Sequence, residues 1–409
     1  MDRGYVPGQL GEWERGDPDG PRSLPFDSAT NLLSRQFPGT RQGDLEMTDI
    51  FLAPRRYIQR EGILEEAGDY IKNFGSRPLV LGDELVFSII RPVLESRLAR
   101  AGLASSFVLF GGECSQGEVI RLEEIARERN TDLVIGTGGG KALDTSRLLA
   151  DRLKVPLIAI PTSAATCSAA SSVAVIYEKG VRQATVNGKA ADLVLVDSTV
   201  LSRAPSRLLA AGMGDSLAKW YEGKPIYDLS TGHDLATQTA MATSAQLREI
   251  ILACGREAKR DVDDGRNSAA VEKIVEANIL ITGVISGLAG SKLRIALAHA
   301  LLFGMTVLPQ IHRNLHGETV SYGIVVQLCM EKNEKELALL LPFFGSLGLP
   351  LTSKELGMNN TEDPRFWEGL RRTCVPESPV HLLPFPVDEQ KIYQAMREAD
   401  ERARPFRAR

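Results

Sequence analysis

The clearest candidate for phosphate chemistry is a run of glycines near one third of the chain. Gly138, Gly139, Gly140 and Lys141 follow the apolar run LVIGT and precede a segment with helical character. Glycines let backbone N–H groups approach a phosphate, and a following helix adds its partial positive charge. The spacing is neither G-x-G-x-x-G nor G-x-x-x-x-G-K-[ST]. The run predicts a phosphate-binding loop, with a simple tight turn as the alternative.

Histidine is scarce, and its distribution is uneven. Three of the five histidines, His299, His312 and His316, fall in one short stretch of the chain. Histidine is the commonest metal ligand and the usual proton-transfer group near neutral pH. A histidine in an apolar helix is also often a satisfied core residue, so the spacing alone leaves metal binding and a structural role both open.

The composition excludes several classes of protein. The 48 basic residues are balanced by 52 acidic ones, which argues against a nucleic-acid partner. The five cysteines lie far apart without C-x-x-C spacing, so neither a disulfide framework nor a structural zinc knot is expected. No apolar run reaches the roughly 20 residues that cross a bilayer, and the N-terminus lacks an apolar signal core. These features predict a cytoplasmic protein without a membrane partner.

Short apolar runs alternate with helical segments over the first half of the chain, which predicts an α/β fold with a parallel sheet. From Ser206 the pattern changes to long helical runs. We therefore expect a disordered extension over 1–46, with a docking arm as the alternative, a nucleotide-binding α/β domain over 47–205 and an all-helical domain over 206–409. Catalysis is expected in the cleft between the two domains. The expected strands are 78–82, 107–110, 133–136, 157–160 and 193–196, and 117–130 is expected to be a crossover helix.

Several longer motifs carry a family resemblance. They are LVLGDELV at 79–86, FGGECSQ at 110–116, GGGKALDT at 138–145, RLLAAGMGDSLAKW at 207–220, and LAHALLFG with NLHGETVSYG between 297 and 323. With these motifs the chain resembles the glycerol dehydrogenase branch of the iron-containing alcohol dehydrogenase superfamily. The resemblance implies the dehydroquinate synthase-like architecture of a nucleotide-binding domain and a helical domain, and a homo-oligomer.

The resemblance also implies NAD as the cofactor. Asp83 would contact the adenosine ribose, which favours NAD over NADP because a carboxylate repels a 2′-phosphate. An ordinary helix N-cap is the alternative for this residue. The resemblance places Gly139, Gly140, Lys141 and Asp144 around the pyrophosphate, and it carries over three more cofactor-binding residues: Thr162, Ser171 and Tyr177.

A metal centre follows from the same resemblance. Its implied ligands are Asp215, His299 and His316, a set with an open position for substrate, as in catalytic zinc sites. Iron-dependent relatives have a further histidine where Lys219 stands here, so Zn²⁺ is favoured over Fe²⁺. The metal would favour the alkoxide of the substrate and so promote hydride transfer to the cofactor. His312 is a candidate proton relay, or else a structural residue.

Three departures from the family bear on the substrate. Cys167 stands where glycerol dehydrogenases have an aspartate that contacts the polyol, which puts it in the substrate site and makes glycerol a poor fit. Leu302 and Phe303 replace polar residues, and Lys292 and Arg294 lie within two turns of His299. We expect a reversible dehydrogenase of a secondary alcohol or 1,2-diol. The alternatives are a 2-hydroxy acid dehydrogenase, with Arg294 or Lys292 on the carboxylate, and a sugar phosphate cyclase. The two cations could instead lie on a solvated helix face.

Overall fold

The computed structural model describes residues 51–290, 293 and 295–406. Contacts divide the chain into two units, 1–42 and 43–409. The extension predicted over 1–46 lies outside the described residues, as do the two cations Lys292 and Arg294.

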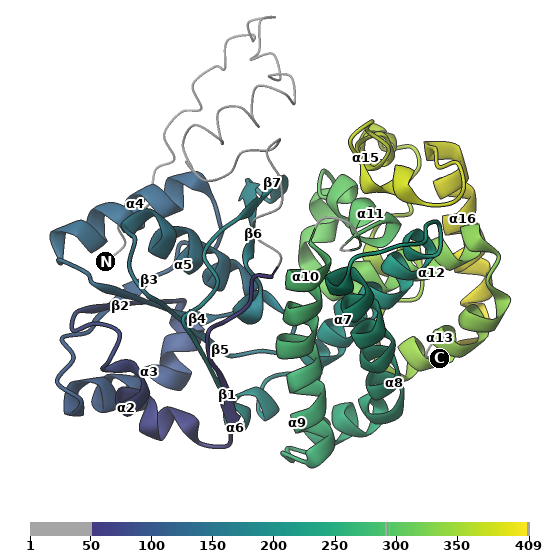
Figure 1. The fold of residues 1–409 in the computed structure, drawn as a ribbon. Helices are drawn as coiled ribbons and strands as arrows, with labels where there is room; N and C mark the ends of the chain where they lie inside the picture. Colours follow the sequence, from purple (N-terminus) through teal and green to yellow (C-terminus); the bar gives the residue numbers. More distant parts are fainter. Residues whose placement is uncertain (1–50, 291–292, 294, 407–409) are drawn as a thin grey trace, which may run out of the picture. The chain divides into compact units, whose positions relative to one another are not determined.

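A six-stranded parallel sheet organises the first half of this unit (Figure 1). The strand order is β1-β8-β5-β4-β2-β3, and every neighbouring pair is parallel. The strands are β1 (Tyr57–Arg60), β2 (Pro78–Gly82), β3 (Ser106–Leu109), β4 (Leu133–Gly138), β5 (Leu157–Pro161) and β8 (Leu193–Asp197). All five predicted strands are confirmed; β1 was not predicted.

Side chains alternate between two apolar layers on the faces of the sheet. Val80 packs with residues of α2 (Ala67–Ile71) and α3 (Glu84–Arg100) on one face. Its neighbours Leu79 and Leu81 pack on the opposite face with residues of α4 (Gln116–Glu128) and α5 (Gly140–Leu153). The strands are buried on both faces, which is why they read as continuous apolar runs. The predicted crossover helix is α4.

A two-stranded antiparallel hairpin was missed by the sequence analysis. It consists of β6 (Val173–Glu178) and β7 (Val181–Asn187), joined at Lys179 and Gly180. Both turn residues have positive φ, 51° and 81°, as a type I′ hairpin turn requires. Because lysine rarely adopts this conformation, the dipeptide was a weak turn signal.

From Ser206 onward the described residues form helices and loops only. The helices are α7 (Ser206–Tyr227), α8 (Leu235–Asp263), α9 (Ala269–Glu276), α10 (Thr282–Ala289), α11 (Leu297–Met305), α12 (His316–Glu331), α13 (Glu334–Leu347), α14 (Ser353–Leu356), α15 (Pro364–Thr373) and α16 (Glu389–Arg402). The α/β architecture with a helical C-terminal part is thus confirmed. The α5 face of the sheet and these helices share one apolar core. A domain boundary at 205/206 coincides with the start of α7 and stays a prediction.

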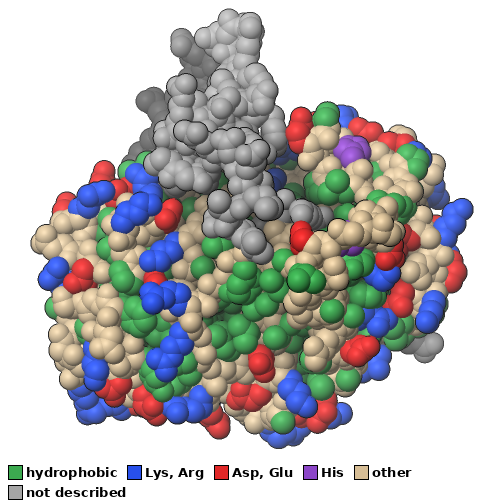
Figure 2. Space-filling model, viewed as in Figure 1, with side chains coloured by type: hydrophobic (Ala, Val, Ile, Leu, Met, Phe, Trp, Pro, Cys, Tyr) green, Lys and Arg blue, Asp and Glu red, His purple; other side chains and the backbone are tan. Residues whose placement is uncertain are grey.

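The surface has mixed charge. On the face drawn in Figure 2, basic and acidic side chains are interspersed, and apolar side chains gather near its centre. Within the described part of the chain, no helix combines the length and apolar character that a membrane span needs.

A buried carboxylate fixes the start of the fold to the sheet. Asp197, at the end of β8, accepts hydrogen bonds from the backbone N–H groups of Gly62 (3.0 Å), Leu64 (3.1 Å) and Thr199 (3.0 Å). The Asp197→Ala variant should lower the free energy of unfolding by about 2–4 kcal/mol, because it leaves buried donors unsatisfied. Denaturant titration measures this change. The control Asp151→Ala changes a half-buried carboxylate on α5 and should stay within about 0.5 kcal/mol. Equal effects of the two variants would contradict the role of Asp197.

Candidate functional site

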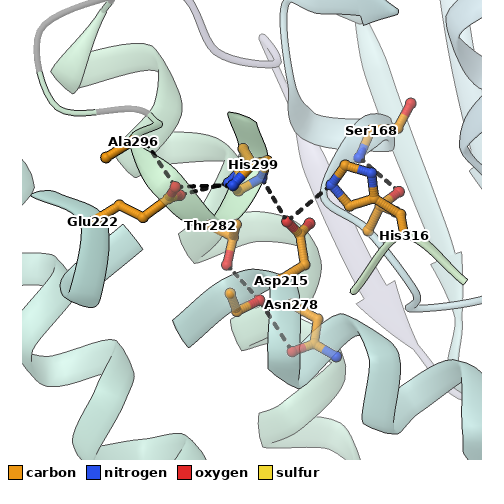
Figure 3. A network of polar contacts seen from close by, with 10 residues as sticks. Ser168, Asp215, Glu222, Asn278, Thr282, Ala296, His299 and His316 are labelled. Carbon is orange, nitrogen blue, oxygen red and sulfur yellow. Dashed lines mark hydrogen bonds and ion pairs between the residues drawn. The ribbon is translucent and has the colours of Figure 1, made fainter. Parts of the chain in front are cut away.

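Three predicted metal ligands converge from three helices. Asp215 lies in α7, His299 in α11, and His316 is the first residue of α12. Their ligand atoms all lie within 4.8 Å of one another. Asp215 Oδ1 is 3.2 Å from His299 Nε2 and 3.4 Å from His316 Nε2 (Figure 3). Two imidazoles and one carboxylate around a shared point are a donor set that suits Zn²⁺ or Fe²⁺.

A buried glutamate holds the first histidine in place. Glu222 Oε2 lies 2.5 Å from His299 Nδ1, and Oε1 accepts the backbone N–H groups of Ala296 (2.7 Å) and His299 (3.0 Å). With Nδ1 engaged as a donor, Nε2 presents its lone pair toward Asp215 and His316. Metal-bound histidines commonly carry such a carboxylate on the far ring nitrogen. The donor set and its support therefore fit a divalent cation.

The pKa directions of the ionisable side chains at the site also favour a bound cation. Burial would raise the pKa of Asp215, but His316 and His299 hold it well below its usual range. Burial likewise opposes ionisation of Glu222, yet His299 and two backbone N–H groups lower its pKa. For His299, burial is outweighed by Glu222 and Asp215, which raise the pKa of the imidazole. The two buried carboxylates are thus stabilised by nearby positive charge. Either a proton on His299 or a divalent cation supplies it.

Glycines set how closely the ligand-bearing helices approach. A Cβ on Gly317 would lie 1.7 Å from the carbonyl oxygen of Ala211, so the first turn of α12 packs directly on α7. A Cβ on Gly214 would lie 2.6 Å from the Gly317 carbonyl oxygen. Real side chains do not tolerate such contacts. The glycines beside Asp215 and His316 therefore bring these two ligands together.

A polar network ties the loop after β5 to the same helix. Asn278 lies in a π-turn over Ala277–Ile281, a feature common near functional sites. Its Nδ2 donates to the carbonyls of Ala164 (2.9 Å) and Leu209 (3.1 Å), and its Oδ1 accepts from Ser216 Oγ (3.2 Å), next to Asp215. The loop that carries Cys167 is thereby fixed against α7, the helix that carries Asp215.

The glycine loop lies at the position that parallel sheets use for ligands. β2 has β3 on one side and β4 on the other, so the carboxyl ends of β2 and β4 flank a topological switch point. Asp83 follows β2, and Gly139 and Gly140 follow β4. Gly138 has a φ of +117°, and Gly139 caps α5 without a side-chain hydrogen bond. The N–H groups of the first turn of α5 thus begin at this edge, as a phosphate site requires.

Gly139 itself needs no special backbone conformation. Its φ is −89°, and a Cβ built on it would meet only Ser163 Oγ, at 4.0 Å. At Gly140 a Cβ would meet Thr166 Oγ1 at 3.1 Å, which a small shift can relieve. The fold alone therefore does not require glycine at Gly139, and close approach of a ligand to the backbone is a physical reason for its presence.

Other predicted cofactor residues make internal contacts. Asp83 caps α3 by accepting the N–H of Val86 at 2.8 Å, as its alternative interpretation expected. Asp144 is buried and accepts from Ser168 Oγ (2.6 Å) and the N–H of Val175 (3.0 Å); burial raises its pKa. It therefore links α5 to β6 within the protein.

The remaining cofactor candidates lie nearby. Lys141 Nζ is 5.2 Å from the ring centre of Tyr177, a cation–π distance. The N–H of Thr162 donates to the Gly138 carbonyl at 3.1 Å, and Ser171 Oγ accepts the N–H of Val173 at 3.1 Å. Their contacts to NAD stay a prediction.

The two residues predicted on the catalytic or substrate side differ in their surroundings. Cys167 interacts electrostatically with Asp215 and Lys219, and burial raises its thiol pKa to about 11, which keeps it neutral. His312 Nε2 instead contacts the carbonyl of Thr306 at 2.8 Å, and its ring packs beneath Gly180 of the hairpin turn. Among the described residues it is outside the ligand cluster, and its relay role stays a prediction.

An apolar side chain borders the ligand cluster. The Phe303 ring lies 6.1 Å from the ring of His299 and 6.3 Å from that of His316, and Leu302 beside it is buried. The guanidinium carbon of Arg182, on β7, lies 4.2 Å from the Phe303 ring centre. Leu302 and Phe303, two of the departures noted in the sequence, thus place apolar surface beside the predicted metal ligands, and Arg182 adds a cation that the sequence analysis did not single out.

Sequence reasoning missed Glu222 and Asn278. Glu222 follows Asp215 by seven residues, two helical turns, so both face the same side of α7. An acidic residue at that spacing in an apolar helix was an available signal. No comparable local signal marks Asn278, because its partners come from distant segments.

The family model, the two relatives and the solved structure that follow all bear the names of dehydrogenases. The family model described as iron-containing alcohol dehydrogenase matches residues 54–198. A glycerol dehydrogenase of Pseudomonas putida is 34% identical over 360 residues, covering 87% of this chain and 98% of that protein. A hydroxycarboxylate dehydrogenase A of Escherichia coli is 32% identical, covering 72% and 81%. The crystal structure of a probable glycerol dehydrogenase from Sinorhizobium meliloti 1021 superposes with a TM-score of 0.79 at 29% identity, covering 87% and 99%.

The position of Glu222 gives a direct test of the metal site. In Glu222→Gln, an amide replaces a carboxylate that accepts three N–H donors, so one donor must lose its acceptor. We expect affinity for Zn²⁺ to fall about 10- to 100-fold, measured by competition with a chromogenic chelator. Asp400→Asn changes a half-buried carboxylate that also accepts a backbone N–H, that of Ser353, away from the cluster, and should leave the affinity unchanged. Unaltered affinity in Glu222→Gln would refute this support role.

Proposed function

The chain belongs to the glycerol dehydrogenase-like branch of the iron-containing alcohol dehydrogenases, which are oxidoreductases acting on alcohol groups, and we propose that it is a metal-dependent, NAD-linked dehydrogenase. Its reaction is reversible hydride transfer between NAD and a secondary alcohol or 1,2-diol. The observation that carries this proposal is the convergence of Asp215, His299 and His316, with Glu222 behind His299.

Each element of the site has a role in this reaction. Asp215, His299 and His316 hold a divalent cation, and Glu222 fixes the orientation of the His299 ring. When bound, that cation acts as a Lewis acid toward the substrate oxygen. The glycine loop and the N-terminus of α5 would hold the pyrophosphate of NAD, and Asp83 would contact the ribose; the bound cofactor would supply the hydride acceptor. Leu302 and Phe303 exclude water from the reacting atoms.

We propose Zn²⁺ as the metal, with Fe²⁺ as the alternative. Lys219 lies one helical turn after Asp215, where a fourth protein ligand would come from. A charged lysine ammonium has no lone pair for a metal, so three protein ligands remain, as in catalytic zinc sites. Two histidines and a carboxylate also hold Fe²⁺ in other proteins. Elemental analysis of the purified protein distinguishes the two metals.

The substrate side argues against glycerol. The neutral thiol of Cys167 lies near Asp215, and it is a weak hydrogen-bond partner for a polyol hydroxyl. A second candidate function, dehydrogenation of a 2-hydroxy acid, draws support from the similarity to a hydroxycarboxylate dehydrogenase and from the cation Arg182 beside Phe303. A cyclase would give no net change in reduced nicotinamide absorbance, whereas a dehydrogenase changes it.

Metal removal and ligand replacement test the proposed chemistry. Chelation should abolish NAD reduction in a panel of diols, alcohols and hydroxy acids, and Zn²⁺ or Fe²⁺ should restore it. Asp215→Asn should lower kcat/KM by about a thousandfold or more, since a Lewis acid contributes several kcal/mol to the transition state. Activity that survives complete metal removal, verified by elemental analysis, would refute the proposal.

The open space at Gly139 allows a specific test of the cofactor loop. Gly139→Ala should fold normally, because its φ suits alanine and its Cβ meets no atom closer than 4.0 Å. The new methyl group should nevertheless raise the dissociation constant for NADH at least about tenfold, or 1.4 kcal/mol, measured by fluorescence titration.

Gly117→Ala is the matched control for this test. Gly117 lies in the first turn of α4, and a Cβ there would also meet nothing within 4 Å. This variant should bind NADH as the parent protein does. Equal NADH affinity in both variants would mean that the dinucleotide does not approach Gly139.

A further inference from the structure

One buried cation close to the ligand cluster has no hydrogen-bond or ion-pair partner among residues 51–290, 293 and 295–406. Lys219 lies in α7, one turn after Asp215, and is 5% exposed. Among the residues that the structure describes, none forms a hydrogen bond or ion pair with its side chain. Residues one turn apart share a helix face, so Lys219 and Asp215 point to the same side of α7.

An unpaired buried ammonium is costly, and the protein avoids that cost elsewhere. Removing an ion from water costs several kcal/mol unless hydrogen bonds or an opposite charge replace the lost hydration. Arg147, 1% exposed, illustrates the usual solution, because its guanidinium donates to the carbonyls of Ser168, Val173 and Lys189. Within the described part of the chain, Lys219 has no such set of acceptors. An anionic group from outside the chain would meet this need.

Lys219 belongs to the substrate side of the site. Its charge acts electrostatically on Asp215, His299 and Cys167. Cys167 occupies the loop position that the family resemblance assigns to substrate contact. A ligand that reaches the metal-binding side chains from this loop therefore comes within range of the Lys219 ammonium.

The charges of the site select a monoanion. Two buried carboxylates, Asp215 and Glu222, balance one divalent cation, and the histidines bind it in their neutral form. With these charges balanced, the ammonium of Lys219 gives this group of residues a net charge of +1. A neutral diol would leave that charge uncompensated, whereas one substrate carboxylate balances it. Three neighbouring side chains add no negative charge that would repel a substrate carboxylate: the thiol of Cys167 is neutral, and Leu302 and Phe303 are apolar.

We propose that Lys219 is the residue that determines substrate class, by pairing with the carboxylate of a small 2-hydroxy acid or 2-oxo acid. This inference rests on the proposed function, whose substrate it narrows. In the reaction, the hydride leaves C2 of the hydroxy acid for NAD⁺, the hydroxyl proton is released to solvent, and a C2 carbonyl forms. The carboxylate takes no part in the electron transfer and serves for recognition.

Lactate and 1,2-propanediol form a matched substrate pair for the test, because they differ only in a carboxylate against a hydroxymethyl group. The variants are Lys219→Met, which keeps length and removes charge, and Lys219→Arg, which keeps charge. Lys224→Met is the control: Lys224 lies on the same helix but is partly exposed and pairs with Asp228. Metal content and thermal unfolding of each variant are measured first, and kinetics use the metal-loaded enzyme with NAD⁺.

We expect the parent enzyme to prefer lactate. In Lys219→Met the ratio of kcat/KM for lactate to that for 1,2-propanediol should fall about 10- to 100-fold, through KM, as expected for the loss of a charged hydrogen bond. Lys219→Arg should recover part of the ratio, and Lys224→Met should keep it. A parent enzyme that oxidises the diol but not lactate, or an unchanged ratio in Lys219→Met, would overturn the role of Lys219 while leaving the dehydrogenase function intact.

Binding provides a readout that is independent of turnover. Oxamate, a non-reducible 2-oxo acid analogue, should bind the metal-loaded protein in calorimetry about 10- to 100-fold more weakly after Lys219→Met. If neither lactate nor the diol is oxidised but oxamate binding depends on Lys219, the carboxylate site stands and the proposed function fails. Oxamate binding that is equal in the parent and Lys219→Met would contradict the carboxylate site itself.

Discussion

The close contact between α7 and the first turn of α12 is the constraint on which the site depends. With Gly317 against the Ala211 carbonyl and Gly214 against the Gly317 carbonyl, the two helix backbones meet without intervening side chains. This contact sets the 3.4 Å distance between Asp215 Oδ1 and His316 Nε2. A Cβ on Gly212, in turn, would lie 1.9 Å from the Ala164 carbonyl oxygen, so the loop after β5 also packs on the α7 backbone. A single helix therefore positions both the predicted metal ligands and the loop that carries Cys167.

Buried charge is the second organising feature. The site holds two carboxylates and a lysine in a region from which water is largely removed. Such groups are destabilising unless their charges are compensated. Hydrogen bonds from backbone N–H groups to Glu222 compensate part of the charge, and cationic ligands or protonated histidines compensate the rest. Function and stability are thus coupled here, because the groups that would bind metal and substrate are those that the fold leaves incompletely satisfied.

The sheet determines where the cofactor side of the site can be. Parallel strands direct all their carboxyl ends to one edge, and the placement of β3 and β4 on opposite sides of β2 opens the switch point there. The core beneath the α5 face continues into the helical half. The edge that carries the glycine loop is therefore joined by packing to the helices that carry Asp215, His299 and His316.

Local sequence patterns were sufficient for much of this architecture. Strands buried on both faces are continuous apolar runs, so β2, β3, β4, β5 and β8 were predictable, as was the amphipathic helix α4. Motifs identified the family and the glycine loop. The hairpin β6–β7 was not predicted because its turn is formed by Lys179 and Gly180, and lysine is not a residue that indicates a positive φ.

Tertiary structure alone decided which side chains meet. Glu222 reaches His299 across 77 positions of the chain, and Asn278 reaches Ala164 across 114. The tertiary structure turned His312 toward Thr306, and it buried Lys219 without a hydrogen-bond or ion-pair partner among the residues that the structure describes. Such pairings depend on long-range packing, in which the approach of two backbones is set by glycines far apart in the chain. The sequence by itself thus determined the elements and the donor types, whereas the three-dimensional packing decided their distances, their partners and the charge left over at the site.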